Sequence, residues 1–293
     1  LPACLSEFKK ELRWNASVDN NLIDRDGVPL LAYAATSDLS KVVSQVLAEI
    51  SKISDSRKRT SYLNACVPKQ GVIGVGITRG CPTLLGAMMT SRADVISLLL
   101  DSGVDPFATD LSGNDGFMSA CIFGRTDNVK FWLKRFPDWD LERKNKVVGG
   151  VALGHAVYMG PHRLELVKVL LEHGASTDFR TNSGGSVFTA LCECEDGDPE
   201  LLQLLLDRGK VNCQINYQYK GQTLKWRNIY RLGSTALNIA AYVGPRKLKL
   251  IRYLVEKQNA SVHSLSKSGT SAFILACENE DADPIRGNGL GKF

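Results

Sequence analysis

The sequence predicts an all-α solenoid, in which helix-turn-helix units stack on one another and β-turn or hairpin tips connect them. Three observations predict this fold class. Glycines recur at a near-constant spacing, apolar helices end repeatedly in a leucine-rich run followed by glycine, and one 17-residue stretch is present twice. Internal periods of 20–50 residues are typical of repeat architectures, because each unit buries its apolar face only against its neighbours.

The recurring glycines mark the start of each unit. They are Gly27, Gly80, Gly113, Gly149, Gly184, Gly233 and Gly269. The steps between them are 53, 33, 36, 35, 49 and 36 residues, so four of the six lie near one period. The two long steps are interpreted as the same period with insertions of roughly 15 to 20 residues.

Each unit is expected to contain a first helix of small residues and a second helix of large aliphatic residues, which fills the space between layers. The second helices end in "LLLDSG", "LLEHG" and "LLLDRG", at Gly103, Gly174 and Gly209. Glycine there adopts the left-handed conformation that closes a helix without a Cβ clash. In "WLKRFPDWD", Phe136 stands in place of this glycine. Since positive φ is costly for Phe, this helix is expected to end by another route.

These units resemble ankyrin repeats, whose pattern is Gly-x-Thr-Pro-Leu-His-x-Ala-Ala and then Val-x-x-Leu-Leu-x-x-Gly-Ala-Asp. "GSTALNIAA" from Gly233, "LLEHGA" from Leu170 and "LLDSGVDP" from Leu99 match most of it. The resemblance covers about seven repeats between Asp24 and Pro284. In the family the Thr-Pro and His residues form a local turn and hydrogen-bond network, but here the His position holds Ala32, Leu85, Met118, Gly154, Thr189, Asn238 and Ile274.

The predicted organisation has three parts. Residues 1–23 form an N-terminal capping helix, because Leu5, Phe8 and Leu12 lie at helical spacing. Residues 24–284 form the ankyrin array, with insertions near 51–79 and 214–231, and residues 285–293 form a flexible tail. The chain starts without Met and ends in a Gly-rich segment, which favours a fragment of a longer protein, and the last repeat is expected to expose a stacking face.

The repeated stretch indicates a duplicated pair of repeats. "AVYMGPHRLELVKVLLE", from Ala156 to Glu172, and "AAYVGPRKLKLIRYLVE", from Ala240 to Glu256, lie 84 positions apart and share eight of 17 residues. The acidic segments "LCECEDGDP" and "ACENEDADP" lie 85 positions apart. Because an ankyrin unit does not require this acidic loop, duplication explains the similarity better than convergence.

The composition is that of a folded protein, with 44% hydrophobic and 23% charged residues and a net charge of +5. No apolar run reaches the length of a membrane span. The eight cysteines are irregularly spaced, which favours a reducing compartment, the cytoplasm or alternatively the nucleus. The isolated array is expected to be monomeric.

No catalytic motif is present, so the protein is predicted not to be an enzyme and to need no cofactor. The cysteines lack the spacing of a zinc site, and Cys192 in "CEC" is interpreted as a small core residue. The glycines of "GVGITRG" (residues 74–80) fit neither the nucleotide fingerprint nor the P-loop.

The resemblance implies a protein partner, of unknown identity, bound by the tips and first helices on the concave side. The second insertion, "QINYQYKGQTLKWRNIYR", combines cationic and aromatic residues without an acidic one, which suits an acidic or phosphorylated partner. The expected partner-binding residues are Phe107, Tyr158, Phe179, Arg180, Lys225, Trp226, Arg227, Tyr230 and Tyr242.

Three alternatives stay open. The aromatic residues of the insertion fold back onto the solenoid, or the two tyrosines pack between repeats. The third alternative is a binder of phosphate groups, in nucleic acid or a phosphoinositide headgroup, that uses the second insertion and the basic trio Arg57 to Arg59. The mild net charge does not favour nucleic acid.

Overall fold

The computed structural model describes residues 6, 7, 9, 10, 22, 23, 28–66, 80–158, 164–182, 184–193, 199–208, 218 and 233–278. The chain divides into two compact units, Leu1–Trp139 (unit 1) and Asp140–Phe293 (unit 2). The regular elements of the described residues are helices, and their extended pairing is limited to isolated bridges such as Thr109 with Asp115. The all-α solenoid predicted from the sequence is confirmed.

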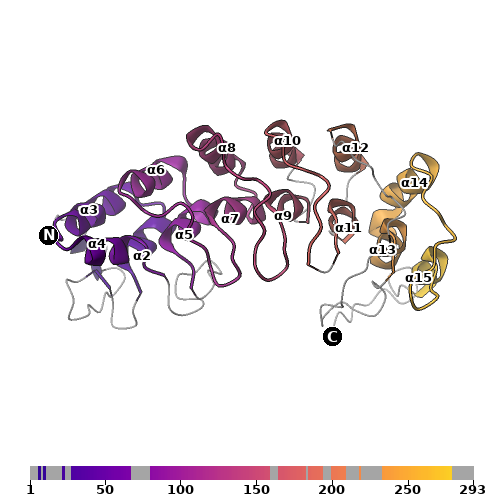
Figure 1. Ribbon diagram of the computed structural model, residues 1–293, viewed down its shortest axis with the longest axis horizontal. Coiled ribbons are helices and arrows are strands. Elements are labelled where there is room, and N and C mark those ends of the chain that lie inside the picture. The colour runs from indigo at the N-terminus through magenta and orange to yellow at the C-terminus, as the bar shows by residue number, and fades with distance from the viewer. Residues whose placement is uncertain are drawn as a thin grey trace. The chain divides into compact units, whose positions relative to one another are not determined.

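Unit 1 contains two layers of helices (Figure 1). The first-helix layer contains α2 (Leu30–Thr36), α5 (Thr83–Thr90) and α7 (Gly116–Ile122). The second-helix layer contains α3 (Ser40–Ser51), α6 (Ala93–Asp101) and α8 (Thr126–Arg135). Within each layer, each helix packs on the next one along the chain. The first predicted insertion contains an additional helix, α4 (Ser56–Leu63), which packs on α3.

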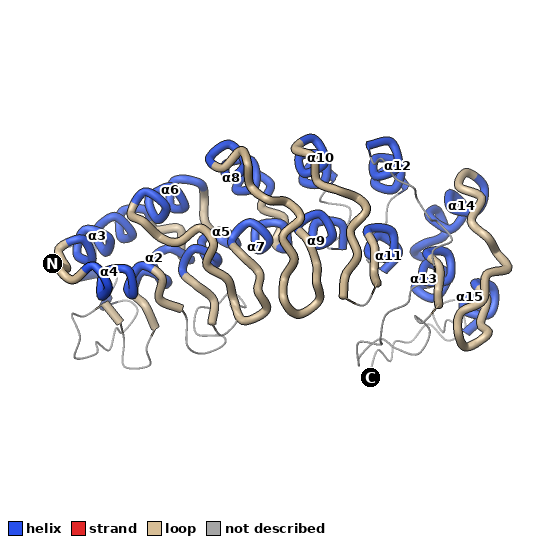
Figure 2. The backbone as a smooth tube through the Cα atoms, viewed as in Figure 1, coloured by secondary structure: helices blue, strands red, loops and turns tan. Residues whose placement is uncertain are grey.

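Unit 2 repeats this arrangement. Its first helices are α9 (Ala152–Tyr158), α11 (Val187–Glu193), α13 (Ala236–Val243) and α15 (Ala272–Glu278). Its second helices are α10 (Leu164–Glu172), α12 (Pro199–Arg208) and α14 (Leu248–Glu256), and the short 3-10 helix η2 (Pro245–Lys247) precedes α14. The hairpin loops project beyond the first-helix layer (Figure 2).

The composition of the helices explains the layers. Ala35, Ala87 and Ala240 on first helices are fully buried, and their small side chains let neighbouring helices approach closely. The buried side chains of the second helices are larger, as at Leu99 and Leu205. Burial of each leucine side chain stabilises the fold by about 1.5–3 kcal/mol.

The duplicated stretches form corresponding elements. Helices α10 and α14 begin and end 84 residues apart, at Leu164 and Leu248 and at Glu172 and Glu256. Leu166 and Leu250, one such pair, are both fully buried. Leu170 and Leu254, a second such pair, are also buried, so the two copies share the leucines of their packing face.

Six of the seven unit-marking glycines have positive φ, between +65° and +82°. They are Gly80, Gly113, Gly149, Gly184, Gly233 and Gly269, and Gly27 lies outside the described residues. Of the predicted helix-closing glycines, Gly103 and Gly174 have φ of +88° and +89°, and Gly209 is not among the described residues. Helix α8 ends instead at Phe136 with φ −129°, which confirms the expected other route.

A polar side chain closes four of the tip turns, three or four residues before the glycine. These residues are Asp110, Asn145, Thr181 and Ser266, and each accepts a hydrogen bond from a backbone N–H within its own turn, at 2.8–3.2 Å. Such local bonds give backbone N–H groups of the tips a side-chain acceptor in place of a paired strand. Consequently the tip backbones are held in defined conformations.

The last first helix, α15, exposes apolar residues. The side chains of Phe273 and Ile274 are exposed, as is that of Leu265 in the preceding loop. Among the described residues, no helix follows α15 to cover them. This agrees with the expected stacking face.

Candidate interaction surface

Two tyrosines at corresponding positions of the duplicated stretch are exposed at the ends of first helices in unit 2. Tyr158 ends α9, and Tyr242 is the penultimate residue of α13. Their side chains are 43% and 42% exposed, although the preceding residues Val157 and Ala241 are buried. A large aromatic side chain that is partly exposed at the end of a packed helix is available to a partner.

The tips before α9 and α11 are connected by hydrogen bonds and contain several Lys and Arg residues. The side-chain ammonium of Lys144 donates to the Arg180 carbonyl at 3.0 Å. The backbone N–H of Asn182 donates to the Val148 carbonyl at 2.9 Å. These contacts hold the loops 143–150 and 178–182 beside each other within unit 2.

The structure corrects one predicted contact residue, Phe179. Its side chain is only 6% exposed, and its ring lies against Gly154 on α9, where an added Cβ would meet the Phe179 ring at 2.5 Å. Gly154 occupies the family's His position, and its missing side chain leaves the space that Phe179 fills. Phe179 is thus a packing residue, and the glycine at that position was the signal that sequence reasoning missed.

Arg180 follows Phe179 on the same tip. One guanidinium nitrogen donates to the Phe179 carbonyl at 2.8 Å and lies 3.6 Å from an Asp178 carboxylate oxygen. The Arg180 side chain is one-third exposed, so it remains partly accessible to solvent. The first contact orients the side chain toward the tip.

Phe107, in unit 1, is 57% exposed and stacks on Trp139 with the ring centroids 5.1 Å apart. Trp139 also contacts Trp132 edge-on at 5.1 Å, and Trp132 is fully buried. Phe117 and Phe136 complete the group, which we call the aromatic cluster (Phe107, Phe117, Trp132, Phe136 and Trp139). Phe107 is its exposed edge.

The four remaining predicted contact residues, Lys225, Trp226, Arg227 and Tyr230, lie outside the described residues. In the second insertion the structure describes Gln218, whose side-chain amide donates to the Leu265 carbonyl at 2.9 Å. This contact places Gln218 beside the loop that precedes α15. The proposed role of the other insertion residues stays a prediction.

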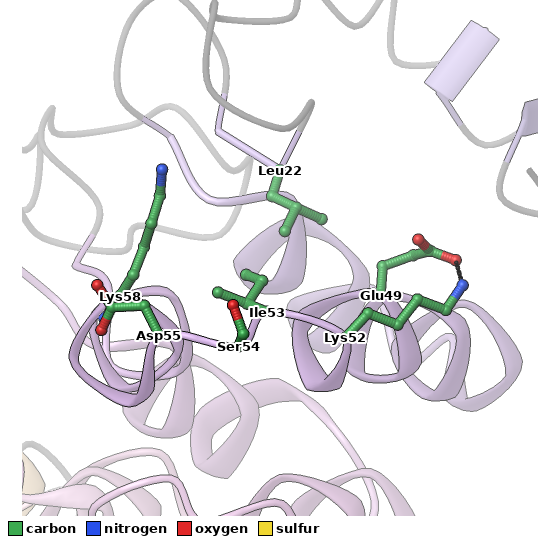
Figure 3. Close-up of a pocket in the computed structure, with 7 residues that line it drawn as sticks. All are labelled: Leu22, Glu49, Lys52, Ile53, Ser54, Asp55 and Lys58. Carbon is green, nitrogen blue, oxygen red and sulfur yellow. Dashed lines mark hydrogen bonds and ion pairs between the residues drawn. The ribbon is translucent and has the colours of Figure 1, made fainter.

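The first insertion borders a hollow of about 450 Å³, shown in Figure 3. It is lined by Leu22, Glu49, Lys52, Ile53, Ser54, Asp55 and Lys58. Asp55 caps α4 by accepting from the Arg57 and Lys58 N–H groups, and Lys52 bonds Glu49 at 2.8 Å. That hydrogen bond lowers the pKa of Glu49. Two carboxylates thus balance the two lysines, so the lining side chains carry no net charge.

The described cysteines behave as core or isolated thiols. Cys192 and Cys121 are buried, which confirms the interpretation of Cys192 as a core residue. Burial raises the pKa of Cys81 to about 12, so this thiol is inert as a nucleophile at neutral pH.

Within the described ranges, no three His, Cys, Asp or Glu side chains are grouped so that they could hold a metal ion. The same residues contain no helix long and apolar enough to cross a membrane.

Asn238 takes over the role of the missing family His in one unit. It is fully buried, accepts from the Thr235 hydroxyl, and its amide donates to the Ser264 and Thr270 carbonyls at 3.3 and 3.2 Å. A buried amide can satisfy several backbone groups at once. Asn238 therefore attaches the loop before α15 to helix α13.

Comparisons with known proteins agree with this geometry. No family model matches the chain. It is 28% identical over 144 residues to the ankyrin repeat and SAM domain-containing protein 6 of Rattus norvegicus, and 29% identical over 138 residues to that of Mus musculus. These matches cover 48% and 46% of this chain but only 15% of either relative.

Among solved structures, the ankyrin repeat domain of Bcl-3, described as a unique member of the IkappaB protein family, is similar with a TM-score of 0.57. The match covers 90% of this chain and 100% of that domain, at 22% identity, and so concerns the fold. The glycine-closed tips, the paired helices in each repeat and these similarities agree, and the chain has the ankyrin-repeat fold.

Proposed function

We propose that this chain is a non-catalytic module that binds a protein partner through the first-helix ends and tips of unit 2. The observation that carries this proposal is the pair Tyr158 and Tyr242, which are exposed at corresponding places on helices whose other side chains are mostly buried. Tyrosine contributes strongly to interfaces, because it buries a large apolar ring and keeps a polar hydroxyl. Ankyrin-repeat relatives support protein binding in general.

In unit 1 the proposed contact residue is Phe107, at the exposed edge of the aromatic cluster. Its ring is already held by Trp139, so binding would cost little side-chain entropy. Binding of the partner on a concave face is part of the proposal. So is a scaffold or regulatory role within a longer protein.

The described thiols suit a reducing compartment, and we propose the cytoplasm. None of the described cysteines, Cys66, Cys81, Cys121, Cys192 and Cys277, forms a disulfide. Disulfides are rare where glutathione keeps thiols reduced.

Replacing both tyrosines should weaken the partner complex by about 30-fold or more, because interface hot spots cost about 2 kcal/mol or more on truncation. The partner would first be captured with the wild-type chain, purified, and its dissociation constant measured by calorimetry. The matched control is Leu248→Ala, an exposed apolar residue on second helix α14. Equal affinities for wild type and the Tyr158→Ala/Tyr242→Ala variant would reject the proposed surface.

A further inference from the structure

We propose that the basic tip of unit 2, defined as Arg143, Lys144, Lys146 and Arg180, recognises an acidic peptide segment in the partner. This inference rests on the proposed function and names the chemistry of the ligand. The loop "RKNKVVGG", residues 143–150, carries three cations and no carboxylate. Arg180 adds a fourth from the neighbouring tip, whose backbone is bonded to this one.

The tip is rigid, which distinguishes it from a solvated run of lysines. Asn145 is buried, and its side-chain oxygen accepts from the Val148 and Gly150 N–H groups at 3.0 and 3.2 Å. The Gly149 N–H donates back to the Asn145 carbonyl at 3.2 Å. Because the backbone is fixed at both ends of the turn, the cations are presented from a preorganised loop, and preorganisation lowers the entropy lost on binding.

An exposed apolar side chain lies among these cations. Val147 directly follows Lys146 and is 62% exposed, while the Asn182 amide donates to its carbonyl at 3.3 Å and fixes its position. Covering the valine with an apolar side chain of the partner would remove its surface from water. The combined surface therefore fits a segment with acidic residues on either side of an apolar one.

Carboxylates at the base of the same tips favour a short acidic segment over a polyanion. Asp140, Glu142 and Asp178 are all exposed. Glu142 accepts from the Ser176 N–H at 2.8 Å, and Asp178 lies beside Arg180. A nucleic acid, with a charge about every 1.7–3.4 Å along its axis, would bring phosphates against these carboxylates. One or two carboxylate side chains of a peptide can contact the cations without approaching these carboxylates of the protein.

The test is selection of peptides from a random peptide library by the full chain. The wild type should enrich peptides with Asp or Glu beside an apolar residue, and the selected peptides would then be titrated by fluorescence anisotropy. Lys144→Glu/Lys146→Glu should weaken binding by about 10-fold, and Lys144→Gln/Lys146→Gln by about 3-fold, since loss of exposed charge pairs weakens binding moderately and charge reversal adds repulsion. Circular dichroism would check that each variant is folded.

The matched control is Lys249→Glu/Arg252→Glu, which makes the same charge change on exposed positions of α14. Equal weakening by this control would show a nonspecific charge effect and overturn the proposal. Stronger binding of a single-stranded oligonucleotide, or of phosphoinositide vesicles, than of any selected peptide would also overturn it. If the tip variants bind the selected peptides normally while the tyrosine variant loses the partner, only this inference fails. If both sets of variants bind normally, the proposed function fails as well.

Discussion

Replacement of Trp132 by alanine is expected to lower the free energy of unfolding by about 3–5 kcal/mol, the usual cost of truncating a large buried aromatic residue. Trp132 is fully buried on α8. Its ring centroid lies 4.9 Å from that of Phe136 and 5.1 Å from that of Trp139. Its removal would leave a cavity within the aromatic cluster, and the neighbouring rings are too large to collapse into it. Urea denaturation followed by circular dichroism measures the loss.

Two further variants separate packing from other effects. Trp132→Phe should cost much less, because it keeps a ring in the cluster and removes an indole N–H that is buried with no hydrogen-bond partner among the described residues. Phe107→Ala removes an exposed stacking partner and should cost no more than about 1.5 kcal/mol. A loss below about 1 kcal/mol for Trp132→Ala would show that the cluster is not a packed core.

Replacement of Gly149 by alanine is expected to cost about 2–4 kcal/mol. The residue has φ +65°, which costs an L-residue roughly 1–2 kcal/mol. An added Cβ would lie 2.9 Å from the Asn182 backbone nitrogen, so the neighbouring tip must also shift. Urea denaturation again gives the free energy, and hydrogen exchange at the Asn182 amide reports whether the two tips separate.

Gly103→Ala is the matched control for that variant. Gly103 has φ +88°, but nothing lies within 4 Å of its added Cβ, so only the backbone strain of about 1–2 kcal/mol applies. The two substitutions therefore differ by the contact with the neighbouring tip. Equal losses for both would contradict the close packing of the tips in unit 2.

The regular features of the fold follow from local residues, and they could be predicted. Glycines at the tips, small residues on first helices and leucines on second helices each have one suitable place in a repeat. The duplicated stretch even gives the 84-residue offset between α10 and α14. Phe136 was identified as an exception because its side chain does not tolerate the conformation that glycine adopts.

The candidate site was less predictable, because it depends on contacts between repeats. The repeat pattern places Phe179 at a tip, yet the space above Gly154 in the preceding repeat decides that it is buried. The cations of residues 143–146 are separated from Arg180 by more than 30 positions, and the bonds between the two loops bring them together. Sequence reasoning placed the basic surface in the second insertion instead, where cations and aromatic residues are contiguous.

The central claim is that the first-helix ends and tips of unit 2 contact a protein partner. Hydrogen–deuterium exchange of the full chain, with and without the captured partner, tests it most directly. We expect slower exchange at residues 143–148 and 178–182 and at the ends of α9 and α13, with α10 and α14 unchanged. Slower exchange confined to α10 and α14, with none at these tips and helix ends, would contradict the account.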